Sequence, residues 1–493
     1  MTVKQSVLSG ELKRDEHHET SRRGPPNRMN DLSYTEWMKF QKSFFWCKND
    51  LKLIQDCVQF FTKARWADST PSRSLVLGFD VSPDEVASPP RLVTVVAAKS
   101  IPLMIAEMRN RMFSLFDFVI VDLSSHLGNE SEMDDFLRTY STDFFRALRG
   151  LLRNERYCCT TVGFQGAGGT GFPIPWSVAL AARDHIRLRD EKIGLDERQE
   201  RLKYCLFFQA TDDHRPSSYL YSDSISMAPE DLHVPMWIIP KSPPRKKNEI
   251  LHPAKFPETL VSKFIELFTK PGETVFDPMV GTGSAVLAAM QLGRNAVGID
   301  LVPDFVSIAR DRVLDAFPSA MLANGKHAKW QLIQGDATRL KEIVELDGTK
   351  FQYVITSPPY WSVLRNPGSE YQRERRQRKL LLAYSDDPKD IGNIVDYDAA
   401  LSTVAEVYKH VSTYLEDERM FTVIVKNLKR HHISYPYAWD LVQELCTPES
   451  PLEYLGNTLW CQDDVPMRPF ALGTHWVSNV VHHYCLHFRK KKR

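Results

Sequence analysis

The chain has 493 residues, with 63 Lys+Arg against 62 Asp+Glu and a formal net charge of +1. At roughly 100–200 residues per domain, this length predicts two to four domains. Hydrophobic residues make up 43% and charged residues 25% of the chain, which is typical of a globular protein and excludes disorder of the whole chain. The balanced charge excludes a highly basic DNA-coating protein and leaves room for a local basic patch.

Membrane, secretory and metal signals are missing from the sequence. No apolar run approaches the ~18 residues needed to span a bilayer. Residues 1–33 are polar and lack the apolar segment of a secretory signal, so we expect a disordered tail there. The eight cysteines form no CxxC pair, which argues against a zinc site or a disulfide framework and favours a reducing, cytoplasmic location.

Residues 34–240 predict an N-terminal α/β region. We expect a buried strand over 116–122 (FDFVIVD), a helix over 134–152, a strand over 156–164 and a charged, solvated helix over 182–204. Residues 238–250 contain two adjacent prolines and an Arg-Lys-Lys cluster, which indicates a linker. GAGGTG at 166–171 matches GxGxxG, but FPIP follows it instead of a helix, so we expect a loop without a cofactor role.

Residues 241–493 predict one catalytic domain. Predicted strands at 273–277, 296–300 and 351–357 alternate with predicted helices at 283–293 and 305–317. Such alternation is typical of parallel βαβ units and of an open α/β sheet.

The two regions share a faint internal similarity. FDFVIVDLSSHLGN at 116–129 parallels FQYVITSPPYWSVLRN at 351–366, and each is followed by a helix and a strand. Two interpretations stay open. Any two α/β segments look alike at this level, or the first region is a decayed second copy in which DLSS stands where the other has SPPY.

A turn in VFDPMVGTGSAVLAA, at 275–289, has features of a nucleoside site. Asp277 ends the predicted strand, and Gly281 and Gly283 let the backbone approach a ligand without Cβ clashes. Asp300 ends the next strand, where a carboxylate accepts hydrogen bonds from ribose hydroxyls, and Asp336 ends a further one, where it would meet an adenine amino group. The turn has neither GxGxxG nor GxxxxGK[ST], so we expect a cofactor without a pyrophosphate.

SPPYW at 357–361 predicts the transfer site. The prolines Pro358 and Pro359 lock φ and remove two N–H donors. Ser357 Oγ and the Pro358 carbonyl can then accept hydrogen bonds from the exocyclic amine of a flipped or single-stranded base, on which Tyr360 can stack. The predicted chemistry is direct in-line methyl transfer by positioning and electrostatics, with no cysteine nucleophile and no metal.

These residues resemble the DNA amino-methyltransferases, which methylate N4 of cytosine or N6 of adenine with S-adenosylmethionine. Residues 252–289, which begin HPAKFPE, resemble motif X running into motif I, and Asp300, Asp336 and SPPY match motifs II, III and IV. IVKN at 424–427 resembles the later strand beside motif IV. The resemblance covers roughly residues 238–493 and implies a Rossmann-like methyltransferase sheet there. It assigns cofactor contacts to Lys255, Phe256, Pro257, Asp277, Pro278, Gly281, Gly283, Asp300 and Asp336, and catalytic contacts to Ser357, Pro358, Pro359 and Tyr360.

The resemblance also bears on specificity. SPPY is commoner in N4-cytosine enzymes and DPPY in N6-adenine enzymes, so cytosine N4 is favoured. Two departures are Met279-Val280, where the family often has Phe-Ala, and the motif order X, I, IV, since many enzymes with HPAKFPE place IV first. The target-recognition region then lies in the N-terminal half or in the insert at 365–382. That insert carries a basic run suited to DNA phosphates or to a solvated helix face, namely Arg373, Arg375, Arg376, Arg378 and Lys379.

The implied partners are double-stranded DNA and a restriction-modification or defence system. Two alternatives stay open: an RNA guanine-N2 methyltransferase, which has similar loops, and a catalytically inactive methyltransferase-like binding protein. The histidine pairs at 431–432 and 482–483 are expected to be structural, because adjacent strand residues point to opposite faces and do not share a metal.

Overall fold

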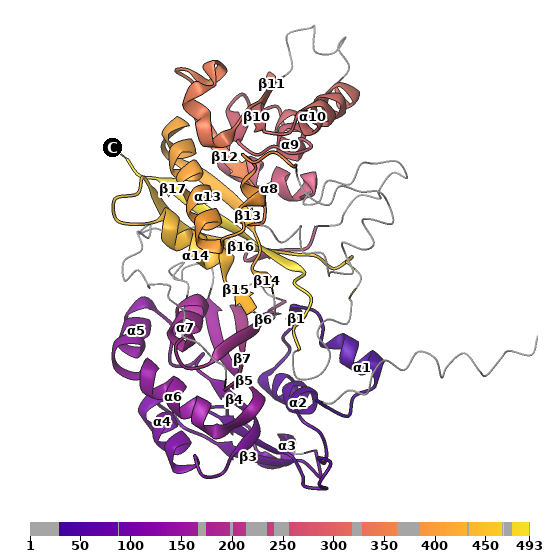
Figure 1. Ribbon diagram of the computed structural model, residues 1–493, viewed down its shortest axis with the longest axis vertical. Helices are drawn as coiled ribbons and strands as arrows, with labels where there is room; N and C mark the ends of the chain where they lie inside the picture. The colour runs from indigo at the N-terminus through magenta and orange to yellow at the C-terminus, as the bar shows by residue number, and fades with distance from the viewer. Residues whose placement is uncertain are drawn as a thin grey trace, which may run out of the picture.

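The computed structural model describes residues 29–86, 88–165, 174–197, 201–212, 234–240, 256–317, 328–361, 385–430, 433–465, 467 and 476–492. The N-terminal and C-terminal halves form two α/β lobes, each with its own sheet, at opposite ends of an elongated molecule (Figure 1). Among these residues, no helix is long and apolar enough to cross a membrane.

The N-terminal half is built on a seven-stranded mixed sheet in the order β1-β6-β7-β5-β4-β2-β3. β7 is antiparallel to β5 and β6, and the other pairs are parallel. The strands are β1 (Phe44–Trp46), β2 (Arg73–Leu77), β3 (Leu92–Val96), β4 (Phe116–Asp122), β5 (Leu152–Gln165), β6 (Arg187–Leu195) and β7 (Arg201–Gln209). The helices are α1 (Tyr34–Lys39), α2 (Asp50–Phe61), α3 (Pro83–Val86), α4 (Ile101–Asn110), α5 (Glu130–Asp135), α6 (Ser141–Leu151) and α7 (Ile174–Ala182).

Most predicted elements of this half are confirmed, and one is wrong. The strands at 116–122 and 156–164 are β4 and part of β5, and the helix at 134–152 is the end of α5, a π-helical turn (Phe136–Tyr140) and α6. The charged helix predicted over 182–204 is instead β6 and the start of β7. Three of its charged residues are not solvated: Arg189, Asp190 and Lys192 are at most 4% exposed. Asp190 pairs with Lys429 of the other half, and Lys192 donates to the carbonyl of Phe40; such long-range partners compensate burial and are not revealed by local sequence.

The C-terminal half is built on an eight-stranded sheet in the order β11-β10-β9-β12-β13-β17-β16-β8. β17 is antiparallel to β13 and β16, and the remaining pairs are parallel. The strands are β8 (Trp237–Ile238), β9 (Thr274–Asp277), β10 (Asn295–Asp300), β11 (Trp330–Gln334), β12 (Phe351–Thr356), β13 (Leu415–Val425), β16 (Leu452–Cys461) and β17 (His482–Lys490), beside a small hairpin of β14 (Leu428–Arg430) and β15 (Ile433–Tyr435). The helices are α8 (Glu258–Phe268), α9 (Ser284–Gln291), α10 (Pro303–Ala316), α13 (Tyr397–Val411) and α14 (Tyr437–Leu445).

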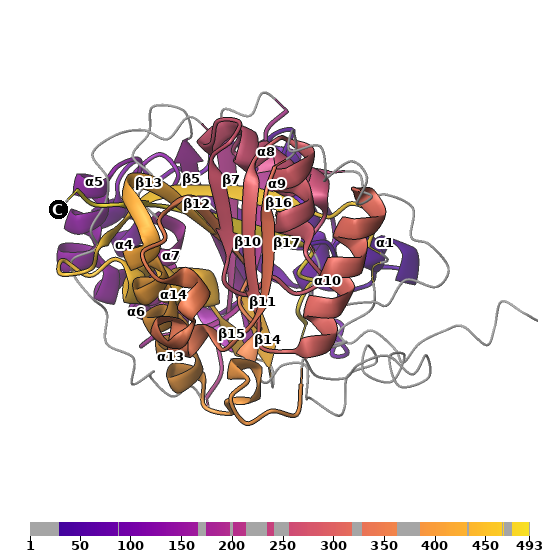
Figure 2. The ribbon, with the colours of Figure 1, turned by 90° about the horizontal axis from the view of Figure 1, so that it is seen from above.

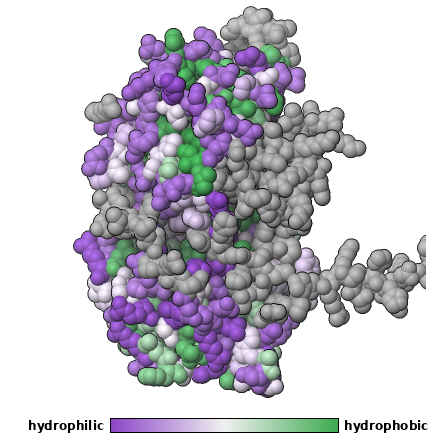
Figure 3. Space-filling model, in the orientation of Figure 1, coloured by the Kyte–Doolittle hydropathy of each residue, from purple (hydrophilic) through white to green (hydrophobic). Residues whose placement is uncertain are grey.

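This second sheet confirms the predicted Rossmann-like α/β fold. Seen from above, α8, α9 and α10 lie on one side of the strands, and α13 and α14 lie on the other (Figure 2). Helices on both faces bury the parallel strands, which read as apolar runs for that reason. On the face drawn in Figure 3, hydrophilic residues predominate and hydrophobic ones gather in small patches.

The two sheets share one strand order. β3-β2-β4-β5-β7-β6-β1 in the first half matches β10-β9-β12-β13-β17-β16-β8 in the second, which adds β11 at the edge. In each sheet the one antiparallel strand, β7 or β17, lies between the same neighbours, and a short first strand pairs in parallel with β6 or β16.

The halves exchange short pieces of chain. β8, whose residues we placed in the N-terminal region and at the start of the linker, pairs with β16 of the C-terminal sheet. The rest of the predicted linker, from 241, lies outside the described residues. In the other direction, Trp476 is fully buried among Phe40, Phe60 and Phe61 of the N-terminal core.

Candidate active site

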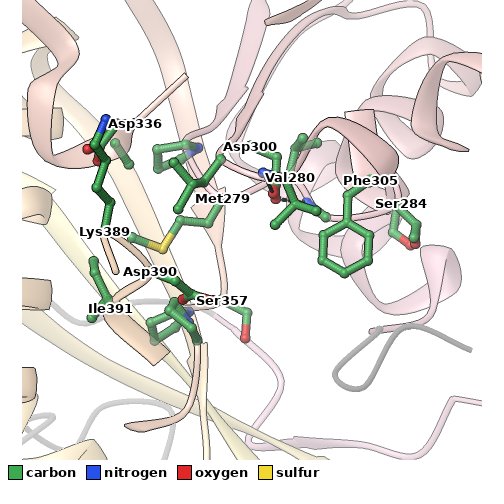
Figure 4. Close-up of a pocket in the computed structure, with 18 of the residues that line it drawn as sticks. Met279, Val280, Ser284, Asp300, Phe305, Asp336, Ser357, Lys389, Asp390 and Ile391 are labelled. Carbon is green, nitrogen blue, oxygen red and sulfur yellow. Dashed lines mark hydrogen bonds between the residues drawn. The ribbon is translucent and has the colours of Figure 1, made fainter. Parts of the chain in front are cut away.

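A pocket opens at the carboxyl ends of β9, β10 and β12. Figure 4 shows Asp336 and Lys389 on one side of it, Phe305 and Ser284 on the other, and Met279 and Asp300 between them. The pocket is lined by Phe256, Pro278, Met279, Val280, Gly281, Thr282, Ser284, Asp300, Leu301, Val302, Phe305, Asp336, Ala337, Ser357, Pro358, Pro359, Lys389, Asp390 and Ile391. The strand order reverses at β9, which has β10 on one side and β12 on the other. Ligands of open α/β sheets bind at the carboxyl ends of the strands at such a point.

The glycine turn after β9 forms the floor of the pocket. Gly281 has φ +50° and Gly283 has φ +84°, a region that favours glycine. A Cβ atom on Gly283 would lie 2.8 Å from Ala309 Cβ, so this glycine lets α10 pack against the turn. Gly281 lines the pocket itself, whereas Gly283 supports the turn from behind.

Asp300 joins this turn to the end of β10. Its Oδ2 accepts the N–H of Gly281 at 2.8 Å, and its Oδ1 accepts the N–H of Val302 at 2.9 Å. Burial raises the pKa of the Asp300 carboxyl to about 6, and the two backbone hydrogen bonds oppose that rise. The carboxylate therefore stands fixed in the pocket wall with lone pairs left for a ligand.

Asp277 lies beneath the pocket and does not line it. Its side chain is 1% exposed, and Oδ1 accepts the N–H of Met279 at 3.1 Å. Burial raises the pKa of Asp277 to about 7. Asp277 is predicted to contact the cofactor, but its side chain does not face the pocket; it holds the turn that carries Pro278 and Met279.

Arg312 of α10 ties the glycine turn to α8. Its guanidinium donates to the carbonyl of Thr282 and to Glu258, and Glu258 also accepts a hydrogen bond from Ser284 Oγ at 2.9 Å. Glu258 follows Pro257, the N-cap of α8, whose carbonyl accepts the N–H of Leu260 at 3.1 Å. The motif X segment and the glycine turn are thereby fixed to one another.

The SPPY segment forms the opposite wall. Ser357, Pro358 and Pro359 line the pocket directly after β12. Tyr360 is 7% exposed; burial raises the pKa of its hydroxyl, and a hydrogen bond with Ser357 opposes that rise. The Tyr360 ring lies 5.6 Å from Lys426 Nζ. The Tyr360 side chain therefore lies behind Ser357 and does not line the pocket.

The structure brings most of the predicted site residues together. Eight of them line the one pocket: Phe256, Pro278, Gly281, Asp300, Asp336, Ser357, Pro358 and Pro359. Four others support its walls from behind, namely Pro257, Asp277, Gly283 and Tyr360. The remaining ones lie outside the described residues, namely Lys255, Arg373, Arg375, Arg376, Arg378 and Lys379.

Sequence reasoning missed a third side of the pocket. Lys389, Asp390 and Ile391 come from the segment before α13 and face the glycine turn (Figure 4). Asp390 is held by the N–H of Gly392 at 2.8 Å and by Ser385 Oγ at 2.9 Å. The only local signal was the turn-forming sequence DDPKDIG, which indicates a loop without saying what it faces.

The histidines of β17 have protein neighbours. His482 Nδ1 lies 2.8 Å from Ser43 Oγ, and its Nε2 lies 3.3 Å from Glu191 Oε1. The His483 ring stacks on Trp460 with centroids 4.2 Å apart. Within the described part of the chain, no group of three His, Cys, Asp or Glu side chains is placed to hold a metal ion. The pair at 431–432 lies outside the described residues.

Comparison with known proteins gives short but specific matches. The DNA methylase family matches residues 186–311. The chain is 40% identical to the type II methyltransferase M2.DpnII of Streptococcus pneumoniae over 62 residues, which are 13% of this chain and 23% of that protein. It is 36% identical to the type II methyltransferase M.BglI of Bacillus subtilis over 78 residues, 16% of this chain and 21% of that protein. The matches thus span less than a quarter of the length of these two relatives.

Solved structures give weaker similarities. A putative rRNA methylase from Clostridium thermocellum is 12% identical, covers 47% of this chain and 96% of its own, and has a TM-score of 0.30. The magnesium protoporphyrin IX methyltransferase of Synechocystis PCC 6803 with bound SAM is 13% identical over 48% of this chain and 79% of its own, with a TM-score of 0.27. The sequence matches are the more specific ones, and they show that residues 186–311 are similar to the DNA methylase family.

Proposed function

We propose that this chain transfers a methyl group from S-adenosylmethionine to an exocyclic amino group of a DNA base, with N4 of cytosine favoured over N6 of adenine. One observation carries the proposal. A single pocket places the glycine turn and Asp300, which suit a nucleoside, against Ser357, Pro358 and Pro359, which suit a base amine. The family match over residues 186–311 supports DNA as the substrate.

The residues of the nucleoside side fit this cofactor. Asp300 is held by two backbone N–H groups and offers its remaining lone pairs to ribose hydroxyls. Asp336 uses Oδ1 for the N–H and hydroxyl of Thr338, at 2.9 and 2.7 Å, which leaves Oδ2 to accept from an adenine amino group. Leu301 and Phe305 supply apolar wall beside them. When bound, S-adenosylmethionine supplies a methyl group activated by its sulfonium charge.

The residues of the base side suit an amine acceptor. Pro358 and Pro359 have no N–H, so this wall presents oxygen acceptors: Ser357 Oγ and the backbone carbonyls. Two acceptors that bind the amine hydrogens would direct the nitrogen lone pair toward the methyl carbon of a bound donor. Transfer would form the C–N bond, break the C–S bond and release one amine proton to solvent. A duplex base reaches such a recessed wall only after extrusion from the stack.

DNA contacts beyond the base are proposed for the basic run Arg373, Arg375, Arg376, Arg378 and Lys379. These residues follow the base wall in sequence, and cationic side chains there would bind phosphates at a flipped nucleotide. We also propose that the chain acts within a restriction-modification or defence system, as the relatives named type II methyltransferases suggest.

The test is methyl transfer from tritiated S-adenosylmethionine to duplex DNA and, separately, to transfer RNA. Hydrolysis to nucleosides and mass spectrometry then identify the modified base. We expect label in DNA as N4-methylcytosine. Label as N6-methyladenine would overturn the base preference alone, and label in RNA only would overturn DNA as the substrate. Calorimetric binding of the cofactor without any transfer would identify an inactive binding protein.

A further inference from the structure

The two halves share more than their strand order. α2 and α8 both end on Phe-Thr-Lys, and the threonines Thr62 and Thr269 cap them. Arg91 donates its Nε hydrogen to Thr62 Oγ1 at 3.0 Å, and Arg294 does the same to Thr269 Oγ1 at 3.1 Å. Each arginine also donates to the carbonyl of its threonine, and each directly precedes the third strand of its half, β3 or β10.

A second repeated detail lies in β5 and β13. β5 begins Leu-Arg-Asn-Glu-Arg and β13 begins Leu-Glu-Asp-Glu-Arg. Glu155 and Glu418 take the same place, and both have positive φ, +60° and +63°, at a register shift against the neighbouring strand. A positive φ is uncommon for a glutamate. Its recurrence at the fourth residue of both strands indicates that the two halves are copies of one fold.

Among its described residues, the first copy lacks the features of a cofactor site. In place of the glycine turn and α9 it has Gly78 and a helix of four residues, α3. A Cβ on Gly78 would lie 2.6 Å from Met104 Cε and 3.0 Å from the carbonyl of Asp122, so the space at the end of β2 is filled. Asp122, at the place of Ser357, accepts the hydroxyl hydrogen of Thr161 at 2.6 Å.

Equivalent side chains of the two copies meet where the halves join. Trp176 is the third residue of α7 and Trp439 the third of α14, and their ring centroids are 5.3 Å apart. Tyr204 and Tyr484, at matching places in YCLFF of β7 and YCLHF of β17, interact electrostatically with one another. Self-pairing of equivalent residues is the signature of an interface with two-fold symmetry.

The first copy also reaches toward the base site of the second. Glu191 of β6 accepts a hydrogen bond from Asn427 Nδ2 at 2.7 Å, and Asn427 Oδ1 accepts the N–H of Ala438 in α14 at 3.0 Å. Asp190, which is 1% exposed, pairs with Lys429. The segment from 426 to 430, which follows β13, is therefore held from β6.

That same segment contacts the wall that carries Ser357. Lys426 Nζ lies 5.6 Å from the centre of the Tyr360 ring, and the Arg430 guanidinium carbon lies 4.5 Å from the centre of the Trp361 ring. Tyr360 in turn hydrogen-bonds Ser357. A path of direct contacts thus runs from β6 of the first copy to the base wall.

We propose that the N-terminal half is a copy of the methyltransferase fold without a cofactor site that acts as a built-in partner subunit, and that Glu191 and Asp190 position residues 426–430 against the base wall. This proposal rests on the proposed function in one respect only: it takes the wall formed by Ser357, Pro358 and Pro359 to be the site of the target base. Glu191 and Asp190 are positioning residues, since they reach Ser357 through other side chains and touch neither the cofactor pocket nor its lining.

The test compares Glu191→Ala, Glu191→Gln and a control, Glu453→Ala. Glu453 pairs with Arg489 at 2.7 Å across β16 and β17 and is about as buried as Glu191, with side chains 13% and 11% exposed. We expect Glu191→Ala to lower kcat at least tenfold and raise KM for DNA, with Kd for S-adenosylmethionine within twofold of the parent. Glu191→Gln keeps the acceptor for Asn427 and should restore most of the loss, and Glu453→Ala should leave kcat and KM unchanged.

Amide hydrogen exchange separates this proposal from the proposed function, because it needs no activity. In Glu191→Ala the amide of Ala438 and the amides of residues 426–430 should exchange at least tenfold faster than in the parent and in Glu453→Ala. Unchanged exchange with unchanged kcat would overturn the positioning role. If the parent transfers no methyl group to DNA, the proposed function fails, and the exchange rates alone decide whether β6 holds the segment.

Discussion

Asp300 Oδ2 accepts the backbone N–H of Gly281 at 2.8 Å, so the carboxylate that ends β10 shapes the turn that follows β9. β9 and β10 are hydrogen-bonded neighbours, and this contact links the carboxyl end of one strand to the carboxyl end of the other. One side chain thereby performs two tasks, since it orders the glycine turn and presents lone pairs to whatever occupies the pocket.

Replacing Asp300 with Ala should weaken cofactor binding. Hydrogen bonds to a charged group contribute about 1.5–3 kcal/mol, so we expect Kd for S-adenosylmethionine to rise roughly 10- to 100-fold in calorimetry. Asp304→Asn, an exposed change in the first turn of α10, serves as the control and should leave Kd unchanged. An unaltered Kd in Asp300→Ala would remove this residue from the ribose site.

Cofactor binding should also depend on pH through the same carboxyl. Its pKa is raised to about 6, so Asp300 loses its negative charge, and part of its acceptor capacity, as the pH falls through 6. We expect Kd to be flat above pH 7 and to rise below pH 6. Asp300→Asn has no titrating group there and should bind weakly with no step near pH 6. A step of the same size in that variant would assign the titration elsewhere.

Stability should fall as pH rises through the range in which Asp277 titrates. Burial raises its pKa from 3.8 to about 7, so the native state binds more protons than the unfolded chain between about pH 4 and 7. The free energy of unfolding is therefore highest at the acid end of that window and decreases toward pH 7, by at most about 4 kcal/mol from this group. Asp277→Asn keeps an acceptor for Met279 N–H and should make the dependence smaller, leaving the contribution of Asp300, in denaturant titrations at pH 5 and 8. An equal pH dependence in both proteins would speak against this origin.

Ser357→Ala should reduce turnover without weakening cofactor binding. Ser357 lines the base wall and follows β12, whereas the contacts of Asp300 lie across the pocket. Loss of one positioned hydrogen-bonding group in an active site costs about 100- to 1000-fold in kcat. Single-turnover methylation measures this loss, and calorimetry should give a Kd for S-adenosylmethionine within twofold of the parent. Turnover equal to that of the parent would contradict the role of Ser357.

Alanine substitutions at two glycines of similar φ should distinguish the cost of backbone strain from the cost of overpacking. Gly283 and Gly293 have φ of +84° and +73°, but a Cβ at Gly283 meets Ala309 Cβ at 2.8 Å, whereas nothing lies within 4 Å at Gly293. Gly293→Ala should cost about 1 kcal/mol in unfolding free energy. Gly283→Ala should cost more, by about 1–3 kcal/mol of overpacking, and should impair cofactor binding as α10 shifts. An equal loss of unfolding free energy in the two variants would show that the close contact with Ala309 does not destabilise the protein.

The parts of the site that could be predicted are those whose signals are local. Asp277, Asp300 and Ser357 each follow or end a buried strand, and parallel strands bring their carboxyl ends to one edge. Sequence alone could therefore place all three at this edge, where Asp300 and Ser357 line the pocket and Asp277 lies beneath it. Lys389 and Asp390 carry no such signal. Their place in the pocket depends on how a segment after the insert folds back, which is a long-range property.

The wrong helix at 182–204 has a related cause. A run such as Arg-Asp-Glu-Lys indicates a solvated helix when the neighbours are unknown. Here Asp190 and Glu191 meet Lys429 and Asn427 across the interface, and these contacts stabilise charges in a strand that would otherwise be costly to bury. The faint similarity between 116–129 and 351–366 was the one local sign of that second surface, and it left two interpretations open.

Trp476 has a consequence for the order of folding during synthesis. Its ring fills the space among Phe60, Phe61 and Phe207, and its carbonyl accepts the hydroxyl hydrogen of Tyr157 at 3.2 Å. The N-terminal core is therefore completed by a residue translated roughly 400 positions after Phe61. At about 5–20 residues per second, the emerging first half waits on the order of 20–80 s with an aromatic gap in its centre. The ribosome thus makes the N-terminal half first, yet that half becomes fully native only together with the C-terminal one.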